Sequence, residues 1–118
     1  MQVGGLTKQQ LIAKNYNEIY AHEMAHKMAG GEYAGDINIR RNAQGIPVSG
    51  FVPIRMPVLD KTNPQKTINH ADTVIRAALA PDTPSGQDYK VANSAQQIKM
   101  RAQAIKAENV GRRLDTRG

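Results

Sequence analysis

The supply of large apolar side chains is the feature that most constrains what this chain can fold into. Its 118 residues include one Phe and no Trp, whereas Ala is abundant. A core must therefore be built from Ala, Ile, Val, Leu and Met, which suits closely approaching helices better than a large sandwich. Because this length is near the modal size of a domain, we expect one domain over residues 1–111, followed by a flexible basic tail over residues 112–118.

Three segments have the apolar spacing and the capping signals of helices. Residues 7–29 begin with a candidate threonine N-cap and precede two glycines, and residues 63–80 begin with Asn followed by a first-turn proline. Residues 85–111 carry a narrow apolar seam behind a capping box formed by Ser85 and Asp88. The sequence predicts three helices, with the first packed on the third and the third ending at Gly111.

The segment between the first two helices alternates apolar and polar residues in two places. The alternating residues are Ile37 and Ile39, and then Val52, Ile54 and Met56. Residues 42–45, Asn-Ala-Gln-Gly, have the composition of a turn whose glycine takes a positive φ, and prolines predict that the second strand is an edge or is bulged. The predicted fold class is α+β and mainly helical: three helices with a small β-hairpin or two-stranded sheet near the first helix.

The first helical segment contains His22, Glu23 and His26 in the pattern His-Glu-x-x-His. Residues i and i+4 lie one helical turn apart, so both imidazoles can direct a ring nitrogen at one ion about 2.0–2.1 Å away. The carboxylate of Glu23 would then lie beside the open coordination position, where it can take a proton from bound water. This arrangement is typical of zinc peptidases, with Zn²⁺ as cofactor and Glu23 as catalytic base.

Glu23 shares its side of the helix with apolar residues. At about 100° per residue it falls on one stripe with other members of the segment, and the two histidines lie along the edge. The other members are Ile12, Tyr16, Ile19 and Tyr20. An unpaired carboxylate facing a core is costly, so we expect Glu23 to have a metal ion, its water or a buried cation as partner. The alternative is an ordinary salt bridge to Lys or Arg, with both histidines partly exposed.

Two longer blocks extend the motif. Residues 21–35 read AHEMAHKMAGGEYAG, and residues 76–92 read RAALAPDTPSGQDYKVA. The blocks and their separation, which cover most of residues 17–105, resemble the SprA-related family of bacterial metallopeptidases. The resemblance implies a bacterial zinc peptidase in which His22 and His26 match the metal ligands and Glu23 matches the base. In that family the catalytic role is itself inferred from the motif, so the resemblance implies nothing about the substrate.

One segment departs from the family's pattern. Where the family usually reads Gly-Gly-Glu-Val, residues 49–52 read Ser-Gly-Phe-Val. If the acidic residue of the family supplies a metal ligand, this chain lacks that ligand at Phe51. Two histidines alone would bind zinc weakly, because catalytic zinc normally has three protein ligands and a water.

Three other side chains are candidates for the third ligand. Glu32 follows His22 by ten residues, the spacing of the third ligand in metzincins, and Gly30 and Gly31 could form the turn, although the metzincin glycine would fall on Ala29. Asp72 is a carboxylate beside the apolar stripe of the second helix, which is the gluzincin-like choice. His70 is chemically the best ligand but points nearly away from that stripe. We retain Glu32 as third ligand and Asp72 as its alternative; each can equally be an ordinary solvated side chain.

Composition excludes several classes of protein. The absence of cysteine excludes disulfides, thiolate catalysis and cysteine-bound zinc. No stretch approaches the roughly 20 apolar residues of a membrane span, and the N-terminus lacks the pattern of a signal peptide, so we expect a soluble protein of unspecified compartment. The net charge of +6 comes from scattered basic residues without interleaved aromatics, so nucleic acid is not an expected partner. Only Arg112, Arg113 and Arg117 are clustered.

Two functional hypotheses remain, from different classes. The first is a small zinc-dependent metallopeptidase that hydrolyses peptide bonds through a metal-activated water, with a peptide or protein as substrate. The second is a non-catalytic interaction or assembly module of a bacterial complex, which keeps the peptidase-like helix as a scaffold and binds a protein partner. Phe51 and the small size favour the second hypothesis, whereas Glu23 in an apolar stripe favours the first.

Overall fold

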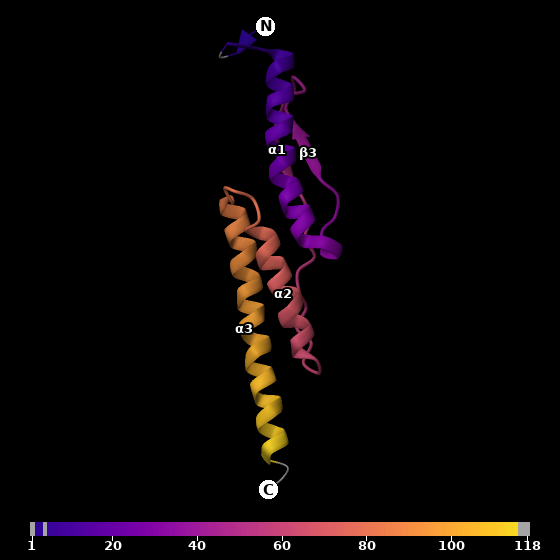
Figure 1. Ribbon diagram of the computed structural model, residues 1–118, viewed down its shortest axis with the longest axis vertical. Coiled ribbons are helices and arrows are strands. Elements are labelled where there is room, and N and C mark those ends of the chain that lie inside the picture. The colour runs from indigo at the N-terminus through magenta and orange to yellow at the C-terminus, as the bar shows by residue number, and fades with distance from the viewer. Residues whose placement is uncertain (1, 4, 116–118) are drawn as a thin grey trace.

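The molecule is a long, thin rod with its two ends at opposite poles (Figure 1). The computed structural model describes residues 2–3 and 5–115, with side chains for residues 5–112. Its principal extents are 79 × 20 × 20 Å and its radius of gyration is 20.1 Å, against about 13 Å for a compact domain of this length. A cross-section of about two helix diameters leaves little of the chain fully buried.

Three helices and two small antiparallel sheets make up the fold. Their order is β1 (Gln2–Val3), β2 (Leu6–Thr7), α1 (Lys8–Gly30), the short 3-10 helix η1 (Gly31–Tyr33), β3 (Asn38–Arg41), β4 (Pro47–Phe51), α2 (Pro64–Ala78) and α3 (Gly86–Asp115). β1 pairs with β2, and β3 pairs with β4. The predicted class, mainly helical α+β with a two-stranded sheet, is confirmed. The additional pairing of β1 with β2 was not predicted.

α1 begins and ends where the sequence predicts. The Thr7 hydroxyl accepts a hydrogen bond from the Gln10 N–H at 3.1 Å, and the Gln10 side chain accepts one from the Thr7 N–H at 2.9 Å. This reciprocal pair is a capping box, which satisfies donors that the first turn leaves free. At the other end Gly31 has φ 54°, a conformation that favours glycine, and the helix stops at Gly30.

The starts of α2 and α3 also follow local signals. Asn63 caps α2 with its side chain ahead of the first-turn proline. Ser85 and Asp88 form the predicted capping box of α3, with bonds of 2.8 and 3.1 Å. The predicted end of this helix at Gly111 is wrong, because α3 continues to Asp115. A glycine ends a helix when it takes a positive φ, and Gly111 does not.

The β3–β4 hairpin lies beside α1 (Figure 1). Its turn is the predicted one: Gly45 has φ 78°, and its N–H donates to the Asn42 carbonyl at 3.0 Å. The register shifts between Arg40 and Arg41, where Arg41 pairs with Pro47. Such a shift is the irregularity expected of a strand that contains proline.

The second strand lies earlier in the chain than its apolar alternation suggested. β4 ends at Phe51, and the alternating residues from Val52 to Met56 leave the sheet. Ile54 keeps one isolated bridge, to Ala34. The alternation therefore came from an extended segment outside the β3–β4 sheet, in which half-buried apolar residues alternate with exposed ones.

α2 and α3 run side by side along the lower half of the rod (Figure 1), and their contact holds the apolar core. The buried hydrophobic residues are Ile68, Ala71, Val74, Ala77, Ala78, Ala92, Ala95 and Ala102. Most are alanines, which let the two helices approach closely, as the composition predicted. The predicted packing of the first helix on the third is wrong: α3 packs along α2, whereas α1 packs on α2 and β4.

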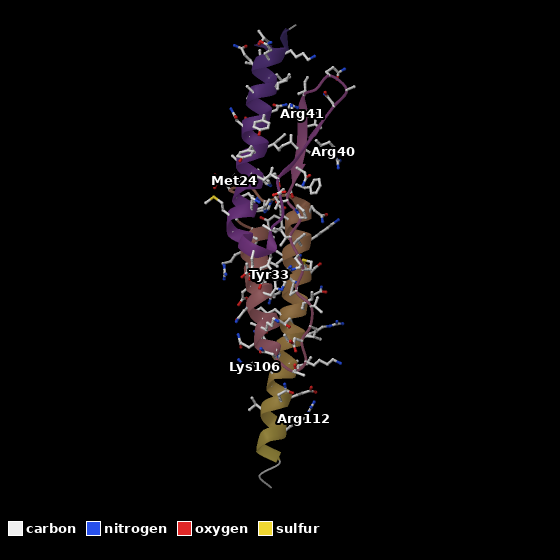
Figure 2. The ribbon with its side chains drawn as sticks, turned by 90° about the vertical axis from the view of Figure 1, so that its right-hand side faces the viewer. Met24, Tyr33, Arg40, Arg41, Lys106 and Arg112 are labelled. Atoms are coloured by element: carbon white, nitrogen blue, oxygen red, sulfur yellow. The ribbon has the colours of Figure 1, made fainter. Side chains whose placement is uncertain are left out.

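The last turns of α3 project beyond α2 at the lower pole of the rod (Figure 2). Glu108 and Arg112 are exposed there, and the Glu108 carboxylate lies 3.7 Å from the Arg112 guanidinium. Lys106 still reaches α2, where its Nζ donates a hydrogen bond to the Gln65 side chain at 2.6 Å. None of the described helices is long and apolar enough to cross a membrane.

Candidate metal centre

His22, Glu23 and His26 come together on the second half of α1, where this helix meets the upper end of the α2–α3 pair. One potential ligand atom from each residue lies within 4.8 Å of those of the other two. His26 and Glu23 are buried, and His22 is half-buried. The helical spacing thus directs the two imidazoles and the carboxylate to one place, as the motif predicts.

Glu23 is only 6 % exposed. Its pKa is raised above the ordinary value chiefly because burial disfavours the charged form, and the neighbouring Asp88 raises it further; His22 and His26 oppose this rise. Its closest ion-pair contact in the described part of the chain is the His22 Nε2, 3.9 Å from the Glu23 carboxylate, rather than a Lys or Arg. The acid is therefore buried beside the histidines, whereas Tyr16 and Tyr20 of the predicted apolar stripe are 36 % and 38 % exposed.

His26 is held in one orientation by α2. Its Nδ1 lies 2.7 Å from the Ala77 carbonyl oxygen. Because a carbonyl can only accept, Nδ1 carries a proton and donates it, which leaves Nε2 of the neutral ring with a lone pair. A histidine that ligates a metal typically donates its other ring N–H to such an acceptor, since this bond fixes the tautomer.

Asp88, from the first turn of α3, is the functional candidate that sequence reasoning missed. Its Oδ1 lies 3.1 Å from the His26 Nε2, and its Oδ2 lies 3.3 Å from the His22 Nε2. From the sequence, this residue was expected only to form a capping box with Ser85. The available signal was its place in residues 76–92, the second block of the family resemblance.

The two side chains retained as third ligands lie apart from this group. Glu32 is exposed on η1 and lines a different cavity, of about 610 Å³. Asp72 is paired with Lys99, at 2.7 Å between the carboxylate and Nζ. His70 stacks on Tyr33, with ring centroids 3.6 Å apart. None of the three belongs to the cluster of His22, Glu23 and His26.

The backbone of β4 can lie directly against Glu23 because residue 50 is a glycine. A Cβ at Gly50 would lie 2.6 Å from the Ile19 Cγ2 and 2.9 Å from the Glu23 Cγ, closer than nonbonded carbon atoms approach. The backbone of β4 therefore runs directly against this part of α1. Phe51, the next residue, is half-exposed and stands at the edge of the site.

A cavity of about 630 Å³ opens over the histidines and Glu23. Apart from these polar groups and Asp88, its lining is largely apolar and comes from α1, β4 and the residues that follow it, and α3. The apolar residues of the lining include Ile19, Phe51, Val52, Ile54, Met56 and Val91. A mostly apolar cavity with a few convergent polar groups is the usual form of a ligand site.

The model of the SprA-related family matches residues 6–113. This match spans all three helices and the residues of the candidate site. No curated protein and no solved structure matches the chain.

Proposed function

The chain belongs to the SprA-related family, and from this premise and the geometry of the site we propose that it is a zinc-dependent peptidase. His22 and His26 hold the zinc ion, and Glu23 is the general base. The observation that carries the proposal is a carboxylate only 6 % exposed beside two histidines. Burying a carboxylate is unfavourable, so its presence there is best explained by a chemical task.

The donor set fits zinc. Imidazole nitrogens are ligands of catalytic zinc sites, and the chain supplies two of them, with the Glu23 carboxylate that serves as base within 4.8 Å. The hydrogen bond from the His26 Nδ1–H to the Ala77 carbonyl supports a ligand role for Nε2. A bound zinc ion would supply Lewis acidity, which polarises a peptide carbonyl and lowers the pKa of water.

The chain's own residues supply proton transfer and a place for the substrate. The Glu23 carboxylate can take a proton from water and pass it to the leaving amine. The apolar cavity above it is large enough for a few residues of an extended peptide. Phe51 and Val91 line this cavity and can exclude water from the scissile bond.

Replacing Glu23 with Gln tests the proposal. Glu23→Gln keeps the shape of the side chain but removes the basic oxygen, so turnover should fall by at least roughly 10²-fold while zinc stays bound. The assay is cleavage of a mixed peptide library by each protein loaded with equimolar zinc, with metal content measured in parallel. Glu108→Gln is the matched control, since Glu108 is exposed on α3, and it should cleave as the wild type does.

Two outcomes would contradict the proposal. Equal cleavage by the wild type and Glu23→Gln, insensitive to a chelator, would mean that the activity comes from a contaminant. A wild-type protein that carries zinc but cleaves nothing would instead favour the interaction or assembly module that keeps the HExxH helix as a scaffold.

A further inference from the structure

The Asp88 carboxylate spans the two histidines. Each of its oxygens faces a different Nε2, at 3.1 Å for His26 and 3.3 Å for His22. Two atoms bound to the same tetrahedral zinc ion at about 2.0–2.1 Å are roughly 3.3–3.4 Å apart. Both separations between Asp88 and the imidazoles are close to this spacing, although each imidazole faces a different oxygen of the carboxylate.

A hydrogen bond between a carboxylate and an imidazole has a similar length to these separations. The positions of the protons must therefore distinguish a hydrogen bond from a shared metal ion. The His26 Nδ1 donates to the Ala77 carbonyl, and in the neutral ring Nε2 then presents a lone pair. The Asp88 oxygen in front of it is also an acceptor. With a neutral ring, two acceptors 3.1 Å apart repel each other unless a metal ion binds both, whereas a doubly protonated ring would form an ion pair with Asp88.

We propose that Asp88 is the third protein ligand of the metal ion. The inference rests on the proposed function, which assigns His22 and His26 to the ion, and adds the carboxylate that the chain lacks at Phe51. Two histidines and one carboxylate form a donor set known from catalytic zinc sites, in which the fourth position is open to water. Glu23 is then left free to act as a base.

The proposed ligand is held in place by the start of α3. The Asp88 Oδ2 accepts a hydrogen bond from the Ser85 N–H at 2.8 Å, and the Ser85 hydroxyl accepts one from the Asp88 N–H at 3.1 Å. These bonds orient the carboxylate as outer-shell partners orient metal ligands. Because the histidines lie on α1, the ion would fasten α1 to the first turn of α3.

The first test compares zinc affinity, measured by competition with a chelating dye at constant pH. Asp88→Asn can still accept from the Ser85 N–H but loses the anionic ligand, so zinc affinity should fall by more than about 100-fold, beyond the 10–100-fold typical of an outer-shell loss. Ser85→Ala is the matched control: it removes half of the capping box and keeps the carboxylate. It should stay within about tenfold of the wild type. A loss below about 100-fold in Asp88→Asn would overturn the ligand assignment.

The second test uses the absence of cysteine from the chain. In Asp88→Cys the introduced thiol is the sole thiol in the protein, so a thiolate-to-metal charge-transfer band on loading with Co²⁺ reports ligation at position 88. The longer metal–sulfur bond, about 2.3 Å, partly compensates for the shorter side chain. Asp72→Cys should give no such band. A band from Asp72→Cys, or none from Asp88→Cys despite bound cobalt, would overturn the inference.

Failure of this inference is distinguishable from failure of the proposed function. If wild-type protein takes up neither zinc nor cobalt, both the metal site and Asp88 as its ligand are wrong. If the wild type binds zinc and Asp88→Asn binds it equally well, only the role of Asp88 is overturned. His22 and His26 would then need another third ligand.

Discussion

The α2–α3 pair and α1 bury different kinds of residues. α2 and α3 bury mainly alanines, together with Val74 and Ile68, and their contact forms the apolar core. α1 is 23 residues long, yet its buried residues are Glu23, His26 and Gly30. Two of these three are the polar groups of the candidate site. The helix with the chemistry therefore contributes little to the apolar core.

This difference separates stability from function along the rod. Burial of apolar area stabilises the fold, whereas burial of a carboxylate and an imidazole opposes it unless these groups are partnered. Substitutions in the α2–α3 pair should therefore change stability first, and substitutions around Glu23 and His26 should change metal binding and turnover first. Four predictions test this division.

The largest effect is expected in the core. Val74, a residue of α2, is fully buried, so Val74→Asp should lower the free energy of unfolding by about 3 kcal/mol or more by burying an unpaired charge. Asn69→Asp places the same charge on an exposed position of α2 and should stay within about 0.5 kcal/mol of the wild type. Urea denaturation followed by circular dichroism measures both. Equal stability of the two variants would show that this helix pair is not the core.

The next largest effect is expected at the candidate metal centre. Zinc at 100 times its Kd should stabilise the wild type by about 2.7 kcal/mol, because the ion binds only the folded state. The double variant His22→Ala, His26→Ala should lose this zinc-induced gain. His70→Ala, which removes the third histidine of the chain, should keep it. Thermal melts with and without zinc provide the measurement, and a zinc response that survives in the double variant would break the assignment.

A smaller effect is expected where β4 crosses α1. Gly50→Ala would place a methyl group against Ile19 and Glu23, which should destabilise the protein by about 1–2 kcal/mol and move β4 away from the acid. Gly86→Ala is the control, because a Cβ there meets nothing within 4 Å, and it should cause no loss. The prediction fails if the two variants melt together and bind zinc alike.

The smallest effect is expected at Asp60, in the loop that leads into α2. The Asp60 Oδ1 accepts hydrogen bonds from the Thr62 hydroxyl and N–H and from the Asn63 N–H, and the Thr62 hydroxyl bond contributes most to lowering the pKa of this carboxyl below its ordinary value of 3.8. A lowered pKa means that the folded state favours the carboxylate. This stabilisation is present above pH 3.8 and is lost as pH falls through the lowered pKa.

Asp60→Ala should therefore be less stable than the wild type at neutral pH, and the difference should shrink in acid. Asp60→Asn keeps an acceptor without the charge, so it should retain part of the capping and lose the pH dependence. Denaturation at a series of pH values tests both variants. A gap between wild type and Asp60→Ala that widens in acid would contradict the assignment.

Local signals in the sequence determined much of the fold and the three central residues of the candidate metal centre. Thr7, Asn63 and the pair of Ser85 and Asp88 cap helices as predicted, because capping depends on residues within one turn. The turn at Gly45 and the convergence of His22, Glu23 and His26 were predictable for the same reason. Each follows from the geometry of one short segment.

Tertiary structure decided the rest. The alternation from Val52 to Met56 resembled a strand because the half-buried apolar residues of this segment line the cavity while the residues between them are exposed. The sequence also did not show that α3 packs on α2 rather than on α1. Asp88 lies 66 positions from His22 in the sequence, and its carboxylate reaches the histidines because the first turn of α3 abuts α1. Periodicity identifies which face of a helix is buried, but not which element covers it. Contacts between distant segments depend on how the helices dock, and no local pattern in the sequence specifies that docking.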